Sequence, residues 1–457
     1  MPDIKPQVDQ LERLSQARPK EWIVTKIGTV ATLITKGATP TTYGYYYTKE
    51  GVLFLRVEDT TEDGQIKSSR LLFINQTTNQ ALQRSQLEAG DILVSIAGTI
   101  GRTAVVKEMD LPANINQALA LIRVDQSKID PRFLQSFILS ELGQKLLLSQ
   151  VIQLAQANIS LSQIASTQIF IPPISEQRHI ADILDILDTQ IQQTEQLIVK
   201  LKQIRVGLLH DLLTRGIDEN GDMRDPVAHP EEFKKTLYGK LGLPAQWNIY
   251  PLERIAKISS GVTLGRNLTG SDTVELPYLR VANVQDGYLD LKEMKTIRVR
   301  KDEVNRFLLQ PGDVLMTEGG DFDKLGRGTV WTGEIPQCLH QNHIFKVRTN
   351  RQYLYPDLLG LVSRSFYGKH FFLLSSKQST NLASINSTQL KAFPIPCPTK
   401  KEQERILGIL NTHDARISTE ESDLAKLKQL KKGLMHDLLT GCVRVTSLIA
   451  ESELASI

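Results

Sequence analysis

The sequence is poor in cysteine, has no long apolar run and carries no excess of charge of one sign, and each shortage excludes a class of protein. Its three cysteines, Cys338, Cys397 and Cys442, are far apart and show no CxxC or Cys/His spacing. We therefore expect neither a disulfide framework nor a zinc or other metal site. No apolar stretch approaches the roughly 18 residues of a membrane span, and the polar start resembles no signal peptide. A cytoplasmic protein with no membrane association is the expectation.

Motifs for nucleotide-dependent or hydrolytic chemistry are also missing. The sequence contains no GxxxxGK[ST] phosphate loop, no GxGxxG turn, no HExxH and no GxSxG. The eight histidines are dispersed. His210 and His436 fall in a repeated HDLLT, where packing or capping at a helix end is expected. His413 falls on an apolar helix stripe, where we expect a hydrogen-bonded interface histidine.

The overall composition is that of an ordinary globular protein. Hydrophobic residues make up 41% and charged residues 23% of the 457 residues. This length corresponds to about three domains of roughly 150 residues. The formal net charge of +3 neither requires nor excludes nucleic acid. If the chain binds DNA, the positive charge that contacts the phosphates must be concentrated locally or must come in part from other subunits.

A tandem duplication is the strongest feature of the chain. KLKQIRVGLLHDLLT at 200–214 returns as KLKQLKKGLMHDLLT at 426–440, an offset of 226 residues (426 − 200). The same offset carries Glu176-Gln177 onto Glu402-Gln403. A repeat unit this long is not a solenoid element, whose period is about 20 to 50 residues. The chain therefore consists of two copies of one unit.

Each copy begins with a globular part. Strand-like runs such as VLFLRV, DILVSIAG and ALALIRV lie within residues 19–173, and PYLRV, GDVLMTEGG and HIFKV follow in the same order within residues 244–398. Helical patterns interleave with both sets. Residues 214–232, rich in Gly, Asp, Asn and Pro, separate the copies and are typical of a linker.

Each copy ends in a long helical pattern. Steps of four and three residues from position 180 to 212 meet Ile or Leu at eight of ten positions, broken by Thr194 and Arg205. The same phase recurs 226 residues later with breaks at His413, Glu420 and Lys431. Both patterns predict coiled-coil seams of some forty residues, near 60 Å, that pack on each other; two helices of an ordinary bundle are the alternative. The apolar seam positions are Ile180, Leu184, Leu187, Ile191, Ile198, Leu201, Leu208 and Leu212, with Ile406, Leu410, Ile417, Leu424, Leu427, Leu434 and Leu438 in the second copy.

In their order and duplication these segments resemble a known family. GDILVSIAGTIGR (90–102), IPPISEQRHIADIL (171–184), HDLLTRG (210–216) and LLTGCVRV (438–445) are together similar to the DNA-specificity subunit of type I restriction-modification systems. The resemblance covers nearly the whole chain. It implies two target recognition domains, each reading one half of a split DNA sequence, and an antiparallel helical spacer.

The resemblance also implies partners. Methyltransferase subunits, two of them, would dock on the helices and carry S-adenosylmethionine, and a restriction and translocation subunit would use ATP and Mg²⁺. The specificity subunit itself would catalyse nothing and bind no cofactor. Consistent with this, the sequence lacks the Asn/Asp-Pro-Pro-aromatic segment expected of an adenine methyltransferase.

Residues that match between the copies cannot discriminate two different half-sites. Arg56 matches Arg280, and Arg102 matches Arg327. These arginines are candidates for phosphate contacts, which position a protein without reading sequence. A structural ion pair is the equal alternative. The matching Gly90-Asp91 and Gly312-Asp313 indicate turns before strands.

Segments that differ are better candidates for reading bases. The counterpart of TPTTYGYYYTKE (39–50) in the second copy is GRNLTGSDTVE (265–275). The counterpart of SIAGTI (95–100) is the acidic TEGGDFDKL (317–325), where Glu318 or Asp321 could accept from a cytosine amino group. Packing is the alternative for the tyrosines, and backbone satisfaction for the amides. In the basic run 292–306, period-two spacing places Arg298 and Arg300 on one strand face, as a phosphate-gripping patch or a solvated surface. The candidate DNA-binding residues are Tyr45, Tyr46, Tyr47, Lys49, Arg56, Thr99, Arg102, Asn116, Gln117, Asn267, Arg280, Arg298, Arg300, Glu318, Lys324, Arg327, Gln341 and Asn342.

We therefore expect an α/β (α+β) protein in which two similar recognition domains are joined by two long antiparallel coiled-coil helices with an internal pseudo-twofold repeat. The expected parts are a first recognition domain (1–173), a first helix (174–214), a linker (215–243), a second recognition domain (244–398), a second helix (399–441) and a tail (442–457). A self-contained DNA-modifying enzyme and a scaffold without DNA function are the alternatives. Binding of S-adenosylmethionine by the chain alone would favour the first, and absence of a salt-sensitive DNA complex would favour the second.

Overall fold

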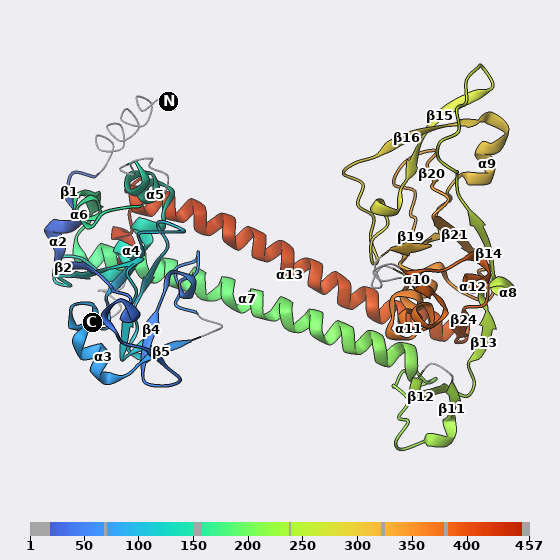
Figure 1. Cartoon of the computed structure of the whole chain (residues 1–457), viewed down its shortest axis with the longest axis horizontal. Helices are drawn as coiled ribbons and strands as arrows, with labels where there is room; N and C mark the ends of the chain where they lie inside the picture. The colour runs from blue at the N-terminus through green and yellow to red at the C-terminus, as the bar shows by residue number, and fades with distance from the viewer. Residues whose placement is uncertain are drawn as a thin grey trace. The chain divides into compact units, whose positions relative to one another are not determined.

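The computed structural model describes residues 19–67, 71–149, 158–236, 239–320, 325–378 and 383–449. The chain forms two compact units. Unit 1 comprises Met1–Gln196 and Ser422–Ile457, and unit 2 comprises Leu197–Glu421. Each unit contains one globular domain together with part of each of two long helices, α7 (Ile174–Thr214) and α13 (Lys400–Thr440) (Figure 1). We call the globular parts domain 1 and domain 2.

Domain 1 is built on two four-stranded sheets. The first has the order β2-β9-β6-β7 and is antiparallel, and the second has the order β3-β5-β4-β8 with β4 and β8 parallel. A further strand pair, β1-β10, brings the two ends of the domain together before α7 begins. The strands are β1 (Ile23–Lys26), β2 (Ala31–Lys36), β3 (Tyr47–Thr48), β4 (Val52–Leu55), β5 (Leu72–Ile74), β6 (Ile92–Ser95), β7 (Thr103–Val105), β8 (Ala113–Ile115), β9 (Leu119–Val124) and β10 (Gln168–Ile171). The helices are α2 (Ile27–Val30), α3 (Gln76–Ala81), α4 (Pro131–Leu139), α5 (Glu141–Leu148) and α6 (Leu161–Ser166).

Strand β6 shows why the sheet holds. All four of its residues are buried, and alternate side chains point to opposite faces of a sheet. Ile92 and Val94 pack with Phe133 and Phe137 of α4, whereas Leu93 packs with residues of the second sheet such as Leu55. Burial of each such side chain stabilises the fold by about 1.5–3 kcal/mol relative to exposure. A continuous apolar run is therefore needed here because the strand is covered on both faces.

Domain 2 repeats the first sheet of domain 1 and has the three-stranded sheet β16-β15-β20 in place of the second. Its four-stranded sheet has the order β14-β21-β17-β19, and β17, like β6, is buried throughout. The strands are β13 (Asn248–Pro251), β14 (Ala256–Ser260), β15 (Thr273–Leu279), β16 (Lys295–Arg300), β17 (Asp313–Thr317), β18 (Gly319–Gly320), β19 (Gly328–Val330), β20 (Leu339–His340), β21 (Ile344–Thr349), β22 (Lys377–Gln378), β23 (Ala383–Ser384) and β24 (Pro394–Cys397). The helices are α8 (Leu252–Ile255), α9 (Val304–Phe307), α10 (Pro356–Arg364), α11 (Phe366–Ser375) and α12 (Ser387–Lys391). The expected mixed α/β fold with an internal repeat is confirmed.

The two long helices pair antiparallel within each unit. Each has 41 residues. In unit 1 the buried Ile180 and Leu184 near the start of α7 join one core with Leu438 near the end of α13. In unit 2 Leu212 near the end of α7 joins Ile406 and Leu410 near the start of α13. The predicted seam is thus confirmed at both ends of each helix.

Two of the polar residues that interrupt the seam have partners on the other helix. In unit 1 Lys431 pairs with Asp188, and in unit 2 Arg205 pairs with Asp414. Both breaks occupy equivalent positions of the repeat, as do their partners. Burial raises the pKa of Asp188, and the hydrogen bond to Asp414 raises that of Arg205. Polar residues at seam positions are a known means of fixing register in coiled coils.

A second pair of interhelical ion pairs flanks the first. Glu195 lies 2.6 Å from Lys428 in unit 1, and Lys202 lies 2.7 Å from Glu421 in unit 2, again at equivalent positions. These side chains are about half exposed, so each pair contributes little on its own, roughly 0–1 kcal/mol. Both pairs form in the same register of the two helices, and together they favour that register.

Two histidine predictions have different outcomes. The ring Nδ1 of His413 is buried and has no hydrogen-bond partner among the described residues, so the expected interface hydrogen bond is wrong for this atom. His210 and His436 lie one turn before the helix ends, where their carbonyl groups accept hydrogen bonds from Thr214 and Thr440. Their rings are exposed.

A buried glutamine fastens each helix to its globular domain. The side chain of Gln177 accepts from Asp130 N and donates to the carbonyl groups of Lys128 and Pro172. Gln403 does the same with Tyr355 N and the carbonyl groups of Tyr353 and Pro398. Each amide thus satisfies loop backbone that would otherwise be buried without partners. The repeated Glu-Gln dipeptide therefore has a structural explanation.

The preceding glutamate joins the start of one helix to the segment that follows the other. Glu176 accepts hydrogen bonds from Trp22 Nε1 at 3.2 Å and from Arg444 at 2.6 and 2.9 Å. Arg444 follows α13, and its pKa is raised by this carboxylate. We call this cluster junction 1.

Unit 2 contains the equivalent cluster, junction 2. Glu402 accepts from Trp247 Nε1 at 3.1 Å, from Ile217 N at 2.9 Å and from Arg224 at 2.6 Å. Arg224 lies in the segment expected to be a linker, and it is buried together with Ile217. Residues 215–243 therefore contain packed structure, including strands β11 (Phe233–Thr236) and β12 (Gly239–Pro244).

Candidate nucleic-acid interface

Three loops meet at one edge of domain 1. The loop after β2 contacts the turn after β8, because Gly37 N donates to Leu119 O and the Thr39 hydroxyl donates to the Gln117 side chain. The loop after β6 joins them through Ile96 N, which donates to Ala118 O at 2.9 Å. The predicted segments 39–50, 95–100 and 116–117 are thus brought together. We call this surface edge 1.

The equivalent loops meet at edge 2 of domain 2. Val262 N donates to His340 O at 2.8 Å, and Asn342 N donates to Val262 O at 2.9 Å. Glu318 N donates to His343 O at 3.0 Å, as Ile96 does to Ala118 in domain 1. Backbone hydrogen bonds therefore join the same three loops in both domains.

The tyrosine loop of edge 1 is largely exposed. It forms a short 3₁₀ turn (Pro40–Tyr43), and Gly44 follows with φ of 78°, a left-handed conformation that favours glycine. Tyr46 is 77% exposed, whereas Tyr47 packs edge-on against Phe54 with ring centroids 5.6 Å apart. Tyr45 is half-buried, and Lys49 and Thr99 are exposed. Packing explains Tyr47, whereas Tyr46 is open to a ligand.

The predicted amides divide between two uses. Asn116 Oδ1 accepts from Ala118 N, and Gln341 Oε1 accepts from Val281 N at 3.4 Å, so both serve backbone groups. Gln117 is exposed beside the tyrosine loop, and Asn267 is exposed in the loop after β14. Asn342 contributes its backbone to edge 2. Asp321 and Lys324 lie outside the described residues.

Glu318 has a partner that sequence reasoning missed. Its Oε2 lies 2.5 Å from Nδ1 of His343. Both side chains are at edge 2, with His343 exposed and Glu318 partly so. His343 directly precedes strand β21, and in the sequence it is only the first residue of the apolar run HIFKV.

The matched arginines all contact their own domain. Arg102 donates to Thr60 O and lies 3.1 Å from Glu62, and Arg56 lies 2.8 Å from Glu58. In domain 2 Arg327 donates to Gln285 and Arg280 to Glu293 O. These contacts support the structural interpretation. Phosphate binding by the exposed remainder of each side chain stays a prediction.

A second matched arginine pair also escaped sequence reasoning. Arg123 binds the buried Asp91 with two hydrogen bonds of 2.8 Å, and Arg348 binds the buried Asp313 at 2.7 and 2.8 Å. The aspartate raises the pKa of each arginine. Each aspartate also accepts from the backbone N–H three residues before it, that of Glu88 or Gln310. Gly90 (φ 88°) and Gly312 (φ 93°) permit the predicted turns.

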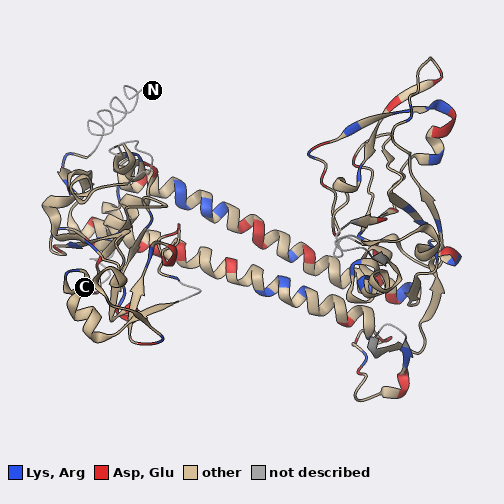
Figure 2. Cartoon of the chain, viewed as in Figure 1, with Lys and Arg blue, Asp and Glu red and all other residues tan. Residues whose placement is uncertain are grey.

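The basic strand of domain 2 carries its own counter-charges. Arg298 and Arg300 are exposed on one face of β16, as the spacing predicts, with Val299 buried between them. Glu275 accepts from Thr296 and Arg298, and these bonds lower its pKa. Blue and red segments accordingly alternate along this hairpin and α9 (Figure 2). Arginines that are already paired with carboxylates neutralise fewer phosphates, so fewer counterions would leave the DNA on binding. The interpretation of this strand as a phosphate-gripping patch is weakened accordingly.

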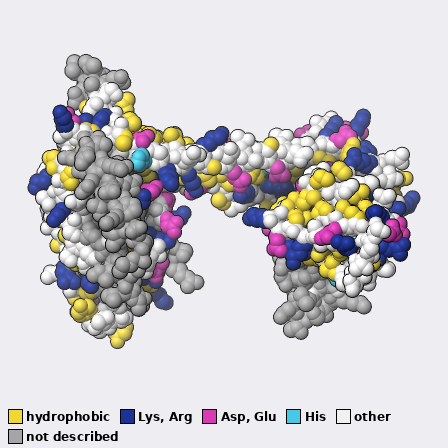
Figure 3. All heavy atoms as spheres, turned by 90° about the horizontal axis from the view of Figure 1, so that it is seen from above, with side chains coloured by type: hydrophobic (Ala, Val, Ile, Leu, Met, Phe, Trp, Pro, Cys, Tyr) yellow, Lys and Arg dark blue, Asp and Glu magenta, His cyan; other side chains and the backbone are white. Residues whose placement is uncertain are grey.

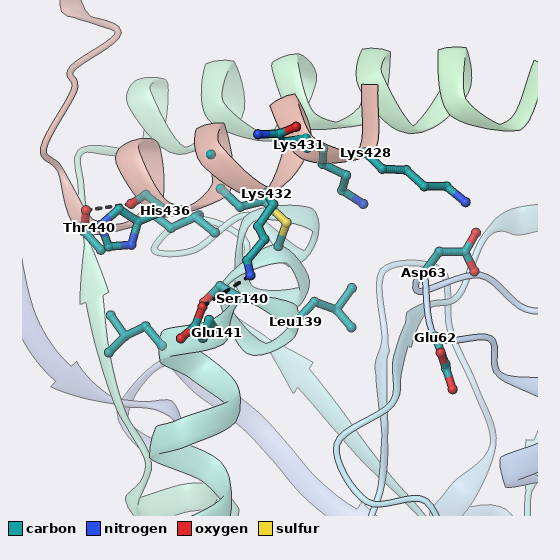
Figure 4. Close-up of a pocket in the computed structure, with 15 residues that line it drawn as sticks. Glu62, Asp63, Leu139, Ser140, Glu141, Lys428, Lys431, Lys432, His436 and Thr440 are labelled. Atoms are coloured by element: carbon teal, nitrogen blue, oxygen red, sulfur yellow. Dashed lines mark hydrogen bonds and ion pairs between the residues drawn. The ribbon is translucent and has the colours of Figure 1, made fainter. Parts of the chain in front are cut away.

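A cleft of about 930 Å³ lies in unit 1 between domain 1 and the end of α13. Lys432 extends from the helix toward Glu141 on the opposite wall, at 3.9 Å (Figure 4), whereas Lys428 and Lys431, which also line the cleft, pair with Glu195 and Asp188 of α7. Charges of both signs likewise mix along the helical part of the chain (Figure 3). A lining that includes carboxylates is poorly suited to phosphate and better suited to protein contacts.

Two of the cysteines belong to the packing. Burial raises the pKa of Cys338 and of Cys397 to about 12, which keeps both thiols protonated. Over the described ranges, no three His, Cys, Asp or Glu side chains are grouped to hold a metal. In the same ranges no helix has the length and apolar character needed to cross a membrane.

Comparison with known proteins agrees with this architecture. The family model of the type I restriction modification DNA specificity domain matches twice, at residues 19–203 and 244–429. The chain is 23% identical over 443 residues to the EcoKI specificity subunit of Escherichia coli K12, covering 93% of this chain and 89% of that protein. It is 29% identical over 229 residues to a putative MjaX specificity subunit of Methanocaldococcus jannaschii, covering 50% of this chain and about half (53%) of that relative.

A solved structure shares the fold. The type I restriction-modification S subunit of M. genitalium superposes with a TM-score of 0.51 at 15% identity, covering 93% of this chain and 96% of the other. The ranges that the family model matches include both domains and most of both long helices. The chain belongs to the family of type I restriction-modification DNA specificity subunits.

Proposed function

We propose that the chain reads a split double-stranded DNA target, with edge 1 contacting one half-site and edge 2 the other. The observation that supports this most is the shared loop frame. In both domains backbone hydrogen bonds hold the same three loops together, and the bond from the residue after β6 or β17 to the turn before β9 or β21 is equivalent, while the side chains on those loops differ. A fixed frame with changed side chains is what two readers of different sequences require, because base contacts specify and common contacts only position.

The subunit is proposed to act without catalysis. Methyl transfer would belong to two methyltransferase subunits, which bind S-adenosylmethionine, and ATP and Mg²⁺ would belong to restriction and translocation subunits. Docking is assigned to the helix faces turned away from the seam, once per copy, in the cytoplasm where the DNA lies. The exposed apolar residues Ile186, Val199 and Ile204 of α7 fit this role.

Methylation sequencing of the host genome with and without this gene tests the proposal. We expect one split adenine-methylation motif to disappear when the gene is deleted. Deletion without change in any methylation motif would contradict the proposal. Methyl transfer to DNA by the purified chain alone would instead support a self-contained enzyme.

A further inference from the structure

At one position the backbone hydrogen bonds of edge 1 and edge 2 are equivalent, but the side chains there are apolar in domain 1 and charged or polar in domain 2. In domain 1 Ile96 N donates to Ala118 O, and Ile159 N donates to Ile96 O. In domain 2 Glu318 N donates to His343 O, and Ile385 N donates to Glu318 O. An apolar Ile/Ala pair and a charged Glu/His pair thus occupy the same backbone site.

The charged pair is not needed to hold the frame. Domain 1 forms the same two backbone hydrogen bonds with Ile96, which is buried, and Ala118. Glu318 and His343 remain open to solvent at edge 2. Their side chains are therefore available to a ligand outside the domain.

We propose that Glu318 is a base-reading residue of domain 2 and that His343 positions it; this rests on the function proposed above. His343 Nδ1 holds Oε2 at 2.5 Å. Oε1 accepts no hydrogen bond from any described residue, so it is available to a donor. In the major groove a carboxylate accepts from the N4 amino group of cytosine.

The sign of the charge makes this assignment selective. A carboxylate beside DNA is repelled by phosphates, so it weakens binding unless an amino group of a base satisfies it. A G·C pair that presents cytosine to Glu318 does so, whereas thymine presents an O4 acceptor and is rejected. The imidazole restricts the carboxylate to one orientation. Domain 1, with Ile96 at this position, reads its half-site by other groups.

The test uses the full chain with its partner subunits in the host, read by methylation sequencing. The variants are Glu318→Gln, His343→Ala, His343→Gln and the double substitution Glu318→Ile with His343→Ala, which installs the pair of domain 1. Glu253→Gln, an exposed carboxylate of α8, is the matched control. Exchange of residues 20–170 identifies which half-site belongs to domain 2.

We expect Glu318→Gln to lower discrimination at one G·C position of that half-site by roughly 10- to 100-fold, leaving the other half-site unchanged. His343→Ala should relax the same position, and His343→Gln, which can still donate, should restore part of it. The double substitution should relax that position without lowering the melting temperature, because domain 1 folds with the same pair.

Three results would overturn the inference. An unchanged motif in every variant would show that the pair reads nothing. Equal loss at all sequences with an unchanged melting temperature would make it a general DNA contact. Loss of folding in the double variant would make it a structural pair. Absence of any split motif with the unmodified chain would instead refute the proposed function, so the two failures are distinguishable.

Discussion

Junction 1 and junction 2 are predicted to differ in strength although each joins a glutamate, a tryptophan and an arginine. In junction 2 the side chains of Arg224 and Glu402 are each 6% exposed. In junction 1 Arg444 is 27% exposed and has a second carboxylate, Glu21, at 3.0 Å. We therefore expect Glu402→Gln to destabilise unit 2 more than Glu176→Gln destabilises unit 1.

The magnitudes follow from what each arginine retains. After Glu402→Gln, Arg224 is left as a buried cation that keeps a backbone oxygen of Arg215 and the amide oxygen of Gln246 as partners. Removing one partner of a buried pair costs about 3–5 kcal/mol. After Glu176→Gln, Arg444 keeps Glu21 and water, and the loss is closer to that of one charged hydrogen bond, about 1–2 kcal/mol. At about 2–4 °C per kcal/mol for a unit of this size, the melting temperature should fall by roughly 6–20 °C and 2–8 °C respectively.

Scanning calorimetry of the intact chain measures both losses, and hydrogen exchange locates them. The amide of Ile217, which donates to Glu402, should exchange faster in Glu402→Gln and stay protected in Glu176→Gln. Equal losses in the two variants would refute the reasoning, because they would show that burial of the arginine does not set the cost. A double variant with Arg224→Met should recover stability by removing the stranded charge.

Three further predictions concern separate features. First, burial lowers the pKa of His340 to about 4 from the ordinary 6.5. The free energy of unfolding of unit 2 should therefore fall by up to roughly 3 kcal/mol as pH drops from about 6.5 to 4, because the unfolded chain takes up the proton first. Urea titrations should show that His340→Leu flattens this pH dependence. Second, a double-mutant cycle on Asp188 and Lys431 should give a coupling of about 1–2 kcal/mol, and a coupling near zero would mean that the seam does not depend on this pair. Third, four residues inserted at equivalent places in α7 and α13 add about 6 Å, so the recognised spacer should grow by one or two base pairs of about 3.4 Å; an active variant with an unchanged spacer would show that the helices do not measure DNA.

The repeat and its period made the long helices predictable, but not the partners of their polar residues. Stepping by threes and fours identifies the seam because apolar spacing is a local property of one helix. Arg205 was only a break in that pattern, since its partner Asp414 lies 209 residues away on the other helix. Arg224 and Arg444 were missed for a related reason. They follow the two helices at different distances, so the repeat offset does not align them.

The candidate interface was predictable as a set of loops and not as a set of contacts. Comparison of the copies indicated 39–50, 95–100, 317–325 and the paired amides. Within domain 1 the structure brings the first two segments to the paired amides, and within domain 2 it brings Glu318 to them. Which side chains serve the backbone, as Asn116 does, depends on turn geometry that the sequence does not display. His343 was hidden for the same reason, because only folding places it beside Glu318.

Side-chain freedom at the edges follows from how the frame is held. At edge 1 and edge 2 the loops are joined by hydrogen bonds between backbone groups, which any residue except proline can donate, and at edge 1 also by the Thr39–Gln117 side-chain bond. The residues that cannot change without cost are Gly37 and Gly261, where a Cβ would lie 2.0 Å from a backbone oxygen of the turn, Gln177 and Gln403 under the helix starts, and the buried Asp91 and Asp313. Because the fastening groups and the exposed loop side chains are different residues, a substitution such as Glu318→Ile changes what the edge presents to DNA and leaves its supports intact. This separation allows one fold to appear twice in a chain with different chemistry at each edge.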